Sequence, residues 1–201
     1  MRLFLVDYDV GNLHSIRKAL ELAGAEVEVV TDMNRLLDAP GIVFPGVGAF
    51  DKTMERLLPV RRQVYDRLVA GVPALGICIG TQIMFEGSEE GKAPGLGVFP
   101  GQVCRLRAQM LPHMGWNTVE SADPLFAGVT DHHFYFAHSY CGRPVRADDS
   151  CVIGTTEYEG NRFPSCFRRY NVYGTQFHPE KSAESGLQVL RNFVTFAEDR
   201  A

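Results

Sequence analysis

The sequence predicts an α/β fold in which a mostly parallel central sheet is flanked by helices, with additional antiparallel strands in the C-terminal half. Three observations lead to this. The first half alternates apolar runs of strand length with segments whose apolar residues recur at helical spacing. The run at residues 72–78 is apolar on both faces, as expected for a strand covered by helices on both sides. The second half carries several closely spaced strand-like runs joined by short turns.

The first half alternates strand and helix. A helix is expected at residues 12–24, where apolar residues recur every three or four positions and Gly24 supplies the stop. A second helix is expected from residue 51 to residue 70, disturbed by Pro59, and a third at residues 81–87. The expected strands of this half are residues 3–9, 26–30, 41–46 and 72–78.

The second half is richer in strands, and a helix at residues 183–198 closes it. The chain shows no repeat, linker or low-complexity segment, so a single domain over residues 1–201 is the simplest expectation. The expected strands of this half are residues 101–107, 132–140, 151–158, 163–170 and 172–177.

Composition and charge exclude several classes of protein. The formal net charge of −4 argues against nucleic acid as the main partner, because phosphate binding usually needs a basic face. No apolar run is long enough to cross a bilayer, and the apolar start is broken by Asp7 too early for a signal peptide. The odd number of cysteines and the lack of a C-x-x-C pair argue against a disulfide scaffold and favour a reducing cytoplasm.

The run Gly76-Ile77-Cys78-Ile79-Gly80 is the sharpest functional signal. A buried strand runs directly into it and a helix is expected after it, which is the arrangement of a nucleophile elbow with cysteine as the nucleophile. Such a turn lifts the side chain above the carboxyl edge of the sheet, where open α/β folds bind ligands. The amides of the following turn favour the thiolate over the thiol. A buried cysteine in a glycine-rich turn is the alternative.

His178 and Glu180 supply what a cysteine nucleophile needs. In an extended segment, alternate residues point the same way, so these two side chains can share a face, with Pro179 stiffening the link. A carboxylate beside an imidazole fixes its tautomer and stabilises the imidazolium that forms when it takes a proton. An exposed strand end is the alternative for this pair taken alone.

The loop Pro45-Gly46-Val47-Gly48 follows an expected strand. Its two glycines let the backbone turn N–H groups toward a ligand, so that with the N–H after Cys78 it could form an oxyanion hole. An ordinary strand-to-helix turn explains the loop equally well when it is considered alone.

Together these motifs, GICIGTQ, QFHPEKS and PGVG, resemble the class I, triad-type glutamine amidotransferases. Four further runs are similar to the glutaminase subunit of imidazole glycerol phosphate synthase, an enzyme of histidine biosynthesis: DYDVGNLHSIRKAL, FEGSEEG, LPHMGWN and FYFAHSY. The resemblance covers almost the whole chain and implies a flavodoxin-like fold.

The resemblance also implies roles for individual residues. Cys78 would attack the side-chain amide of glutamine, His178 would move protons and Glu180 would hold His178. Ammonia would pass to a (β/α)₈-barrel cyclase subunit in a heterodimer, which makes imidazole glycerol phosphate and aminoimidazole carboxamide ribonucleotide. The implied oxyanion-hole residues are Val47, Gly48 and Ile79, and the implied substrate contacts are Gly48, Gln82, Glu90, Ser139 and Tyr140. The implied contacts with the cyclase are Asn12, Met114, Trp116, Asn117, Tyr135 and Lys181.

No cofactor is expected, and a metal site is not favoured. His132 and His133 are neighbours in an expected strand and so point to opposite faces, and no H-E-x-x-H motif occurs. The alternatives for the chain as a whole are a glutaminase serving anthranilate, pyridoxal phosphate or guanylate synthesis, a cysteine peptidase, and a catalytically silent module that activates a partner.

Overall fold

The computed structural model of the chain describes residues 1–9, 13–46, 48–145 and 149–200. The elements of the first half are β1 (Arg2–Val6), α1 (His14–Leu22), β2 (Glu26–Val30), the 3₁₀ turn η1 (Met33–Asp38), β3 (Ile42–Phe44), α2 (Phe50–Leu57), η2 (Leu58–Val60), α3 (Arg61–Val69), β4 (Ala74–Ile77), α4 (Ile79–Gln82) and β5 (Gly87–Ser88). Those of the second half are β6 (Gln102–Arg105), β7 (His113–Thr118), η3 (Pro124–Phe126), β8 (His133–His138), β9 (Tyr140–Arg143), η4 (Asp149–Cys151), β10 (Val152–Tyr158), β11 (Asn161–Arg169), β12 (Val172–Thr175), η5 (Pro179–Lys181) and α5 (Ala183–Glu198).

A central sheet organises the described part of the chain, in the strand order β10-β11-β12-β4-β3-β1-β2. The five strands from β12 to β2 are parallel, whereas β10 and β11 add to one edge as antiparallel strands. The prediction of a mostly parallel sheet with antiparallel additions is therefore confirmed. Because β3, β4 and β12 are parallel neighbours, the segments that follow them emerge at the same edge.

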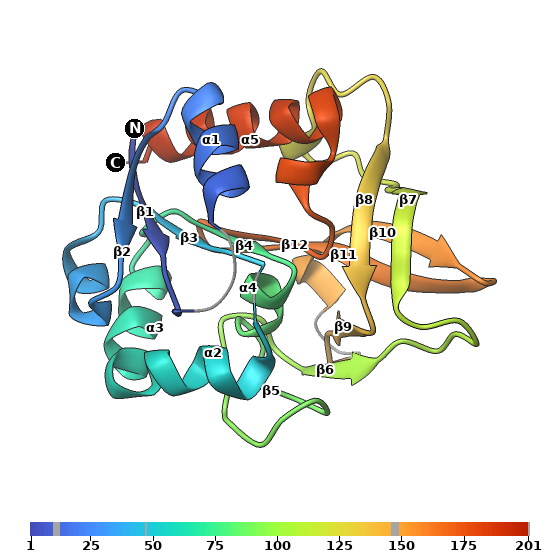
Figure 1. Cartoon of the computed structure of the whole chain (residues 1–201), viewed down its shortest axis with the longest axis horizontal. Helices are drawn as coiled ribbons and strands as arrows, with labels where there is room; N and C mark the ends of the chain where they lie inside the picture. The colour runs from blue at the N-terminus through green and yellow to red at the C-terminus, as the bar shows by residue number, and fades with distance from the viewer. Residues whose placement is uncertain (10–12, 47, 146–148, 201) are drawn as a thin grey trace.

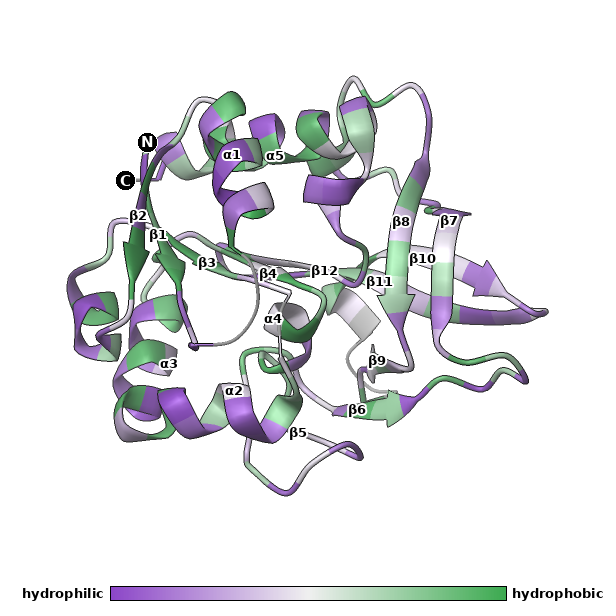
Figure 2. Ribbon diagram, viewed as in Figure 1, coloured by the Kyte–Doolittle hydropathy of each residue, from purple (hydrophilic) through white to green (hydrophobic). Residues whose placement is uncertain are grey.

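Two apolar layers cover the sheet. Alternate residues of a strand face opposite sides, so Phe4 and Val6 pack with α2 and α3, whereas Leu3 and Leu5 pack with α1 and α5. Figure 1 shows α1 and α5 on one side of the sheet and α2 and α3 on the other. In Figure 2, β1 and β3 are hydrophobic along most of their length, as strands buried on both faces should be.

Several elements differ from the sequence prediction. The helix expected at residues 51–70 is broken as predicted, with Pro59 inside the 3₁₀ turn between α2 and α3. The helix expected at 81–87 is wrong in length: α4 ends at Gln82, because the chain turns at residues 83–86 to enter β5. The strand β7 was not predicted, and the run at 132–140 is divided at Ser139 between β8 and β9. In the part of the chain that is described, no helix is long and apolar enough to cross a membrane.

Candidate active site

Cys78 occupies a strained turn between β4 and α4. Its backbone has φ 50° and ψ −108°, a conformation that L-residues adopt rarely and that tends to persist only where the surroundings hold it. Thr81 provides part of that support, since its hydroxyl lies 2.8 Å from the carbonyl oxygen of Gly76 and 2.7 Å from that of Thr175. These bonds connect the turn to β4 and to the neighbouring strand β12.

Gly80 allows the turn to lie close to strand β3. A Cβ atom at this position would lie 2.0 Å from the carbonyl oxygen of Phe44, which is backbone and cannot rotate away. The glycine is therefore required by packing, and it lets the first turn of α4 sit against the sheet.

Replacement of Gly80 by alanine will consequently destabilise the fold by about 3 kcal/mol, the upper end of the usual cost of overpacking a core. The free energy of unfolding in urea measures this. Gly97→Ala serves as the control, because a Cβ there meets no atom within 4 Å and only its φ of +82° opposes the change. That control should lose about 1 kcal/mol. Equal losses in the two variants would show that the contact with Phe44 is not limiting.

His178 and Glu180 form a buried pair beside the elbow. Nδ1 of His178 lies 2.8 Å from Oε1 of Glu180, and the two side chains are only 5% and 8% exposed. The backbone of His178 is held as well, because its N–H donates to the carbonyl oxygen of Tyr135 over 2.9 Å and its own carbonyl accepts from the Ser182 hydroxyl over 2.6 Å. The imidazole is therefore held in place, with Nδ1 directed at the Glu180 carboxylate.

The charge state of His178 follows from three effects. Burial by itself lowers the pKa of an imidazole, but the hydrogen bonds and charges of Cys78 and Glu180 outweigh it and raise the pKa of His178 to about 10. At neutral pH the ring of His178 is thus doubly protonated and positively charged when Cys78 and Glu180 are ionised. A cysteine beside a protonated imidazole offers a nucleophile and a proton donor.

A cavity of about 370 Å³ opens over the Cys78 sulfur. It brings together residues from widely separated parts of the chain, which different sequence motifs had pointed to independently. The predicted residues that line it are Gly48, Cys78, Ile79, Gln82, Glu90, Ser139, Tyr140, His178 and Lys181.

The predicted oxyanion hole is only partly described. Ile79 begins α4, and the N–H groups of a first helical turn have no acceptor within the helix. Gly48 lines the cavity with a φ of +100°. A Cβ at Gly46 would lie 2.8 Å from Cε1 of His178 and 3.0 Å from Cβ of Cys78, so only glycine leaves room for the pair here. Val47, the predicted donor in this loop, lies outside the described residues.

The predicted substrate contacts surround the same cavity. Nε2 of Gln82 donates to the carbonyl oxygen of Tyr140 over 2.9 Å, and the carbonyl of Ser139 accepts from the N–H of Leu106 over 2.8 Å. Glu90 accepts a hydrogen bond from the N–H of Phe50 over 3.2 Å, which places its carboxylate at the start of α2. The roles of these residues toward a substrate stay predictions.

The predicted partner residues gather on the β7–β8 hairpin and beside the cavity. Met114 and Trp116 on β7 are 63% and 54% exposed, and Trp116 stacks edge-on against Tyr135 of β8, with ring centroids 6.2 Å apart. Lys181 lies over the Tyr135 ring at 6.0 Å, whereas Asn117 donates to the backbone of Glu157. With more than half of its surface exposed, Trp116 is not a core aromatic residue. Asn12 lies outside the described residues.

Three residues near the Cys78 sulfur were not predicted as site residues. Gln176 and Ala137 both contact the sulfur, and Ala137 and His138 line the cavity. His138 is hydrogen-bonded to His113 over 3.2 Å, and burial lowers the pKa of His138 to about 3 and that of His113 to about 4. Gln176 could have been found, because it lies in the same QFHPEKS motif, two positions before His178.

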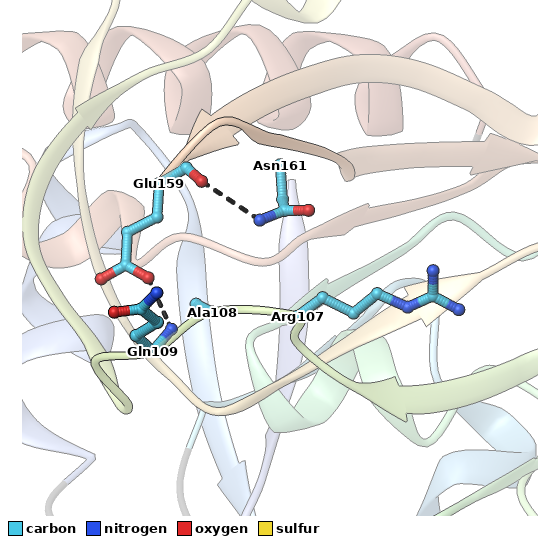
Figure 3. Close-up of a pocket in the computed structure, with 5 residues that line it drawn as sticks. All are labelled: Arg107, Ala108, Gln109, Glu159 and Asn161. Carbon is cyan, nitrogen blue, oxygen red and sulfur yellow. Dashed lines mark hydrogen bonds between the residues drawn. The ribbon is translucent and has the colours of Figure 1, made fainter.

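A larger hollow, about 560 Å³ in volume, lies elsewhere (Figure 3). It is lined by Arg107, Ala108, Gln109, Glu159 and Asn161, none of which belongs to the predicted site. The Glu159 carboxylate accepts hydrogen bonds from the backbone N–H groups of Gln109 and Met110, so it fastens the loop after β6 to the β10–β11 turn. We therefore assign this hollow to loop packing. No cluster of three or more metal-binding side chains occurs among the residues described.

Comparison with known proteins gives a consistent result. Residues 4–196 match the family model described as glutamine amidotransferase class-I. The imidazole glycerol phosphate synthase subunit HisH of Methanocaldococcus jannaschii is 45% identical, covering 94% of this chain and 97% of the relative. The HisH protein of Corynebacterium glutamicum is also 45% identical, covering 96% and 97%.

Solved structures resemble the chain in fold. A crystal structure of a glutamine amidotransferase superposes with a TM-score of 0.76 at 19% identity, covering 97% of this chain and 98% of that one. A putative GMP synthase protein from Thermoplasma acidophilum gives a TM-score of 0.72 at 20% identity, with coverage of 99% and 94%.

Proposed function

Because the chain belongs to the class-I glutamine amidotransferases, and within them to the HisH subunits of imidazole glycerol phosphate synthase, we propose that it hydrolyses glutamine through Cys78, His178 and Glu180 and delivers the ammonia to a cyclase subunit. The observation that carries the proposal is the buried Cys78–His178–Glu180 arrangement, in which Cys78 and His178 line a cavity of about 370 Å³. Membership of the family disfavours a cysteine peptidase. The presence of all three catalytic residues disfavours a silent binding module.

The first half of the reaction forms a thioester. The Cys78 thiolate attacks the side-chain amide carbon of glutamine, and the charge that develops on the amide oxygen is stabilised by backbone N–H groups, of which Ile79 supplies one. His178 then gives its proton to the departing nitrogen, so that the C–N bond breaks and ammonia leaves. The result is a glutamyl thioester on Cys78 and a neutral imidazole.

The second half returns the site to its starting state. The neutral His178 takes a proton from water, which attacks the thioester carbon, and the C–S bond breaks to give glutamate and the thiolate. Glu180 stabilises the imidazolium in both halves and keeps Nδ1 of His178 occupied, so that Nε2 is the nitrogen that exchanges protons.

The proposed partner is the cyclase subunit, and the names of the relatives, which are subunits of imidazole glycerol phosphate synthase, support it. A (β/α)₈ barrel for that partner, a heterodimer and a cytoplasmic location stay predictions. The β7–β8 hairpin is the proposed docking face, supported by two large apolar side chains, Met114 and Trp116, that are more than half exposed.

The function is tested by reconstitution with the cyclase subunit. We expect the chain alone to hydrolyse glutamine slowly and the complex to do so about two orders of magnitude faster, because coupling between two sites is usually of this size. Release of glutamate and formation of imidazole glycerol phosphate are both measured. Full hydrolysis without the cyclase, or no stimulation by it, would contradict the proposed coupling.

Replacement of Trp116 by alanine will weaken binding of the cyclase subunit by about 30-fold, the loss typical of an aromatic anchor at an interface. The dissociation constant is measured by titration calorimetry. Leu58→Ala is the control, because Leu58 is 43% exposed but lies between α2 and α3, away from the β7–β8 hairpin (Figure 1). Equal affinities for the two variants would place the interface elsewhere.

A further inference from the structure

Gln176 is a fully buried amide that touches the nucleophile. It follows β12 directly, its side chain has 0% exposure, and its backbone N–H donates to the carbonyl oxygen of Ser165 over 2.8 Å. Its side-chain Nε2 lies 3.6 Å from Sγ of Cys78, within hydrogen-bond reach for sulfur, and its Oε1 lies 3.2 Å from Nε2 of Gln82. The proton transfers between Cys78, His178 and glutamine leave this residue without a role.

The direction of this hydrogen-bond chain is fixed by a backbone group. The orientation of a glutamine amide usually has to be inferred from its neighbours. Here the carbonyl oxygen of Tyr140 can only accept, so the Gln82 atom 2.9 Å from it must be the nitrogen. The second N–H of that nitrogen donates to Gln176, which therefore presents its oxygen to Gln82 and its nitrogen to the sulfur.

A donor at the sulfur favours one protonation state. A thiolate accepts hydrogen bonds more strongly than a thiol, so a fixed N–H stabilises the charged form. The contact of Sγ with the carbonyl oxygen of Ala137, 3.9 Å away, acts in the opposite sense, because this oxygen can only accept and so favours the protonated thiol. Cys78 is 8% exposed, which leaves little water to stabilise a thiolate.

We propose that Gln176 is a further functional residue of this site, whose side-chain N–H holds the Cys78 sulfur as a thiolate and directs it into the cavity. The inference rests on the proposed function, because it concerns the sulfur that attacks glutamine. Gln176 would thus be a fourth side chain, beside the triad, that contacts the nucleophile, and its own amide oxygen accepts a hydrogen bond from Gln82.

The test compares Gln176→Met and Gln176→Leu with the unchanged chain, each assembled with the cyclase subunit. Both replacements remove the N–H but differ in shape, so an effect that they share reports the lost hydrogen bond. The rate of alkylation of Cys78 by iodoacetamide is followed against pH, with the modified cysteine identified by mass spectrometry. We expect the pH of half-maximal rate to rise by about one unit, equivalent to about 1.4 kcal/mol.

The pH dependence of glutamine-dependent turnover should shift to higher pH as well. Glutamine-dependent turnover at neutral pH should fall about tenfold in both variants and recover partly as the pH is raised, a rescue that damaged packing would not produce. Thr156→Val is the matched control: Thr156 is buried and hydrogen-bonded to Ser165 over 2.8 Å in the same sheet, but it does not contact the sulfur. This control should keep the alkylation profile of the unchanged chain.

The outcomes separate the two proposals. An unchanged alkylation profile in both variants would overturn the role of Gln176, as would a failure of both to assemble with the cyclase subunit, because the residue would then serve folding. The proposed function fails instead if Cys78 of the unchanged chain is alkylated at neutral pH no faster than the partly exposed Cys104.

Discussion

Replacement of Cys78 by alanine will abolish synthesis that depends on glutamine, lowering its rate by at least about 10⁴-fold, because Cys78 supplies the only thiol among the described residues that line the cavity. Synthesis by the same complex from added ammonium salts will stay close to normal. The cyclase receives ammonia in both cases, and only its source changes. Parallel assays of the complex with the two nitrogen donors measure the effect.

The Cys78 prediction has a matched control within the chain. Cys104 is a free cysteine on β6 with an intermediate exposure, and burial together with the charge of Glu89 raises its pKa above the usual value. Cys104→Ala should therefore leave both activities unchanged. If the Cys78→Ala complex still released glutamate at the normal rate, the thioester mechanism would be wrong. Loss of ammonium-dependent synthesis as well would indicate that the change disrupts the complex.

Replacement of Glu180 by glutamine will lower kcat/KM for glutamine by about 10²- to 10⁴-fold. The carboxylate oxygen 2.8 Å from Nδ1 of His178 is one of the groups that hold a proton on the ring. Without it, burial is opposed by Cys78 alone and the pKa of His178 falls, and the new amide can itself donate to Nδ1 and select the wrong tautomer. Steady-state glutaminase kinetics of the complex measure the loss.

The pH dependence of stability gives a second measurement of the same pair. The folded pKa of His178 is about 10, above its ordinary value of 6.5, so protonation stabilises the folded chain fully below about pH 6.5. That contribution is lost as the pH rises through about 10. In Glu180→Gln the lower pKa should move this loss to lower pH, which urea unfolding between about pH 6 and about pH 10 will show.

An exposed pair elsewhere in the chain provides the control for Glu180. His133 and Asp131 also form a histidine–carboxylate contact, with Nδ1 2.6 Å from Oδ1, but their side chains are 55% and 68% exposed. Because water screens such a pair, Asp131→Asn should change neither the kinetics nor the pH dependence of unfolding. A similar effect in both variants would contradict the role assigned to Glu180.

The fold was predictable because its signals are local. Apolar runs and helical spacing located the parallel strands, and Pro59 marked the break between α2 and α3. The helix predicted after Cys78 is too long, because the sequence at residues 83–86 is compatible with a helix. Only the pairing of β5 with β6 ends the helix at Gln82. The strand β7 was missed because it contains Gly115 and Asn117, residues that are depleted in strands, and it is extended only through pairing with β8.

For the site, the sequence by itself determined which residues are present and in which motifs: the cysteine between glycines, the histidine two positions before a glutamate, and a glycine-rich loop. The tertiary structure decided what these residues contact. Parallel pairing of β3, β4 and β12 brings Gly46, Cys78 and His178 to one edge, although about 130 positions separate the first from the last. The contact of Gln176 with the sulfur follows from the same pairing, whereas the exposure of Trp116 follows from the pairing of β7 with β8 in a separate sheet. Contacts between residues distant in sequence depend on which strands pair, and no local pattern specifies that.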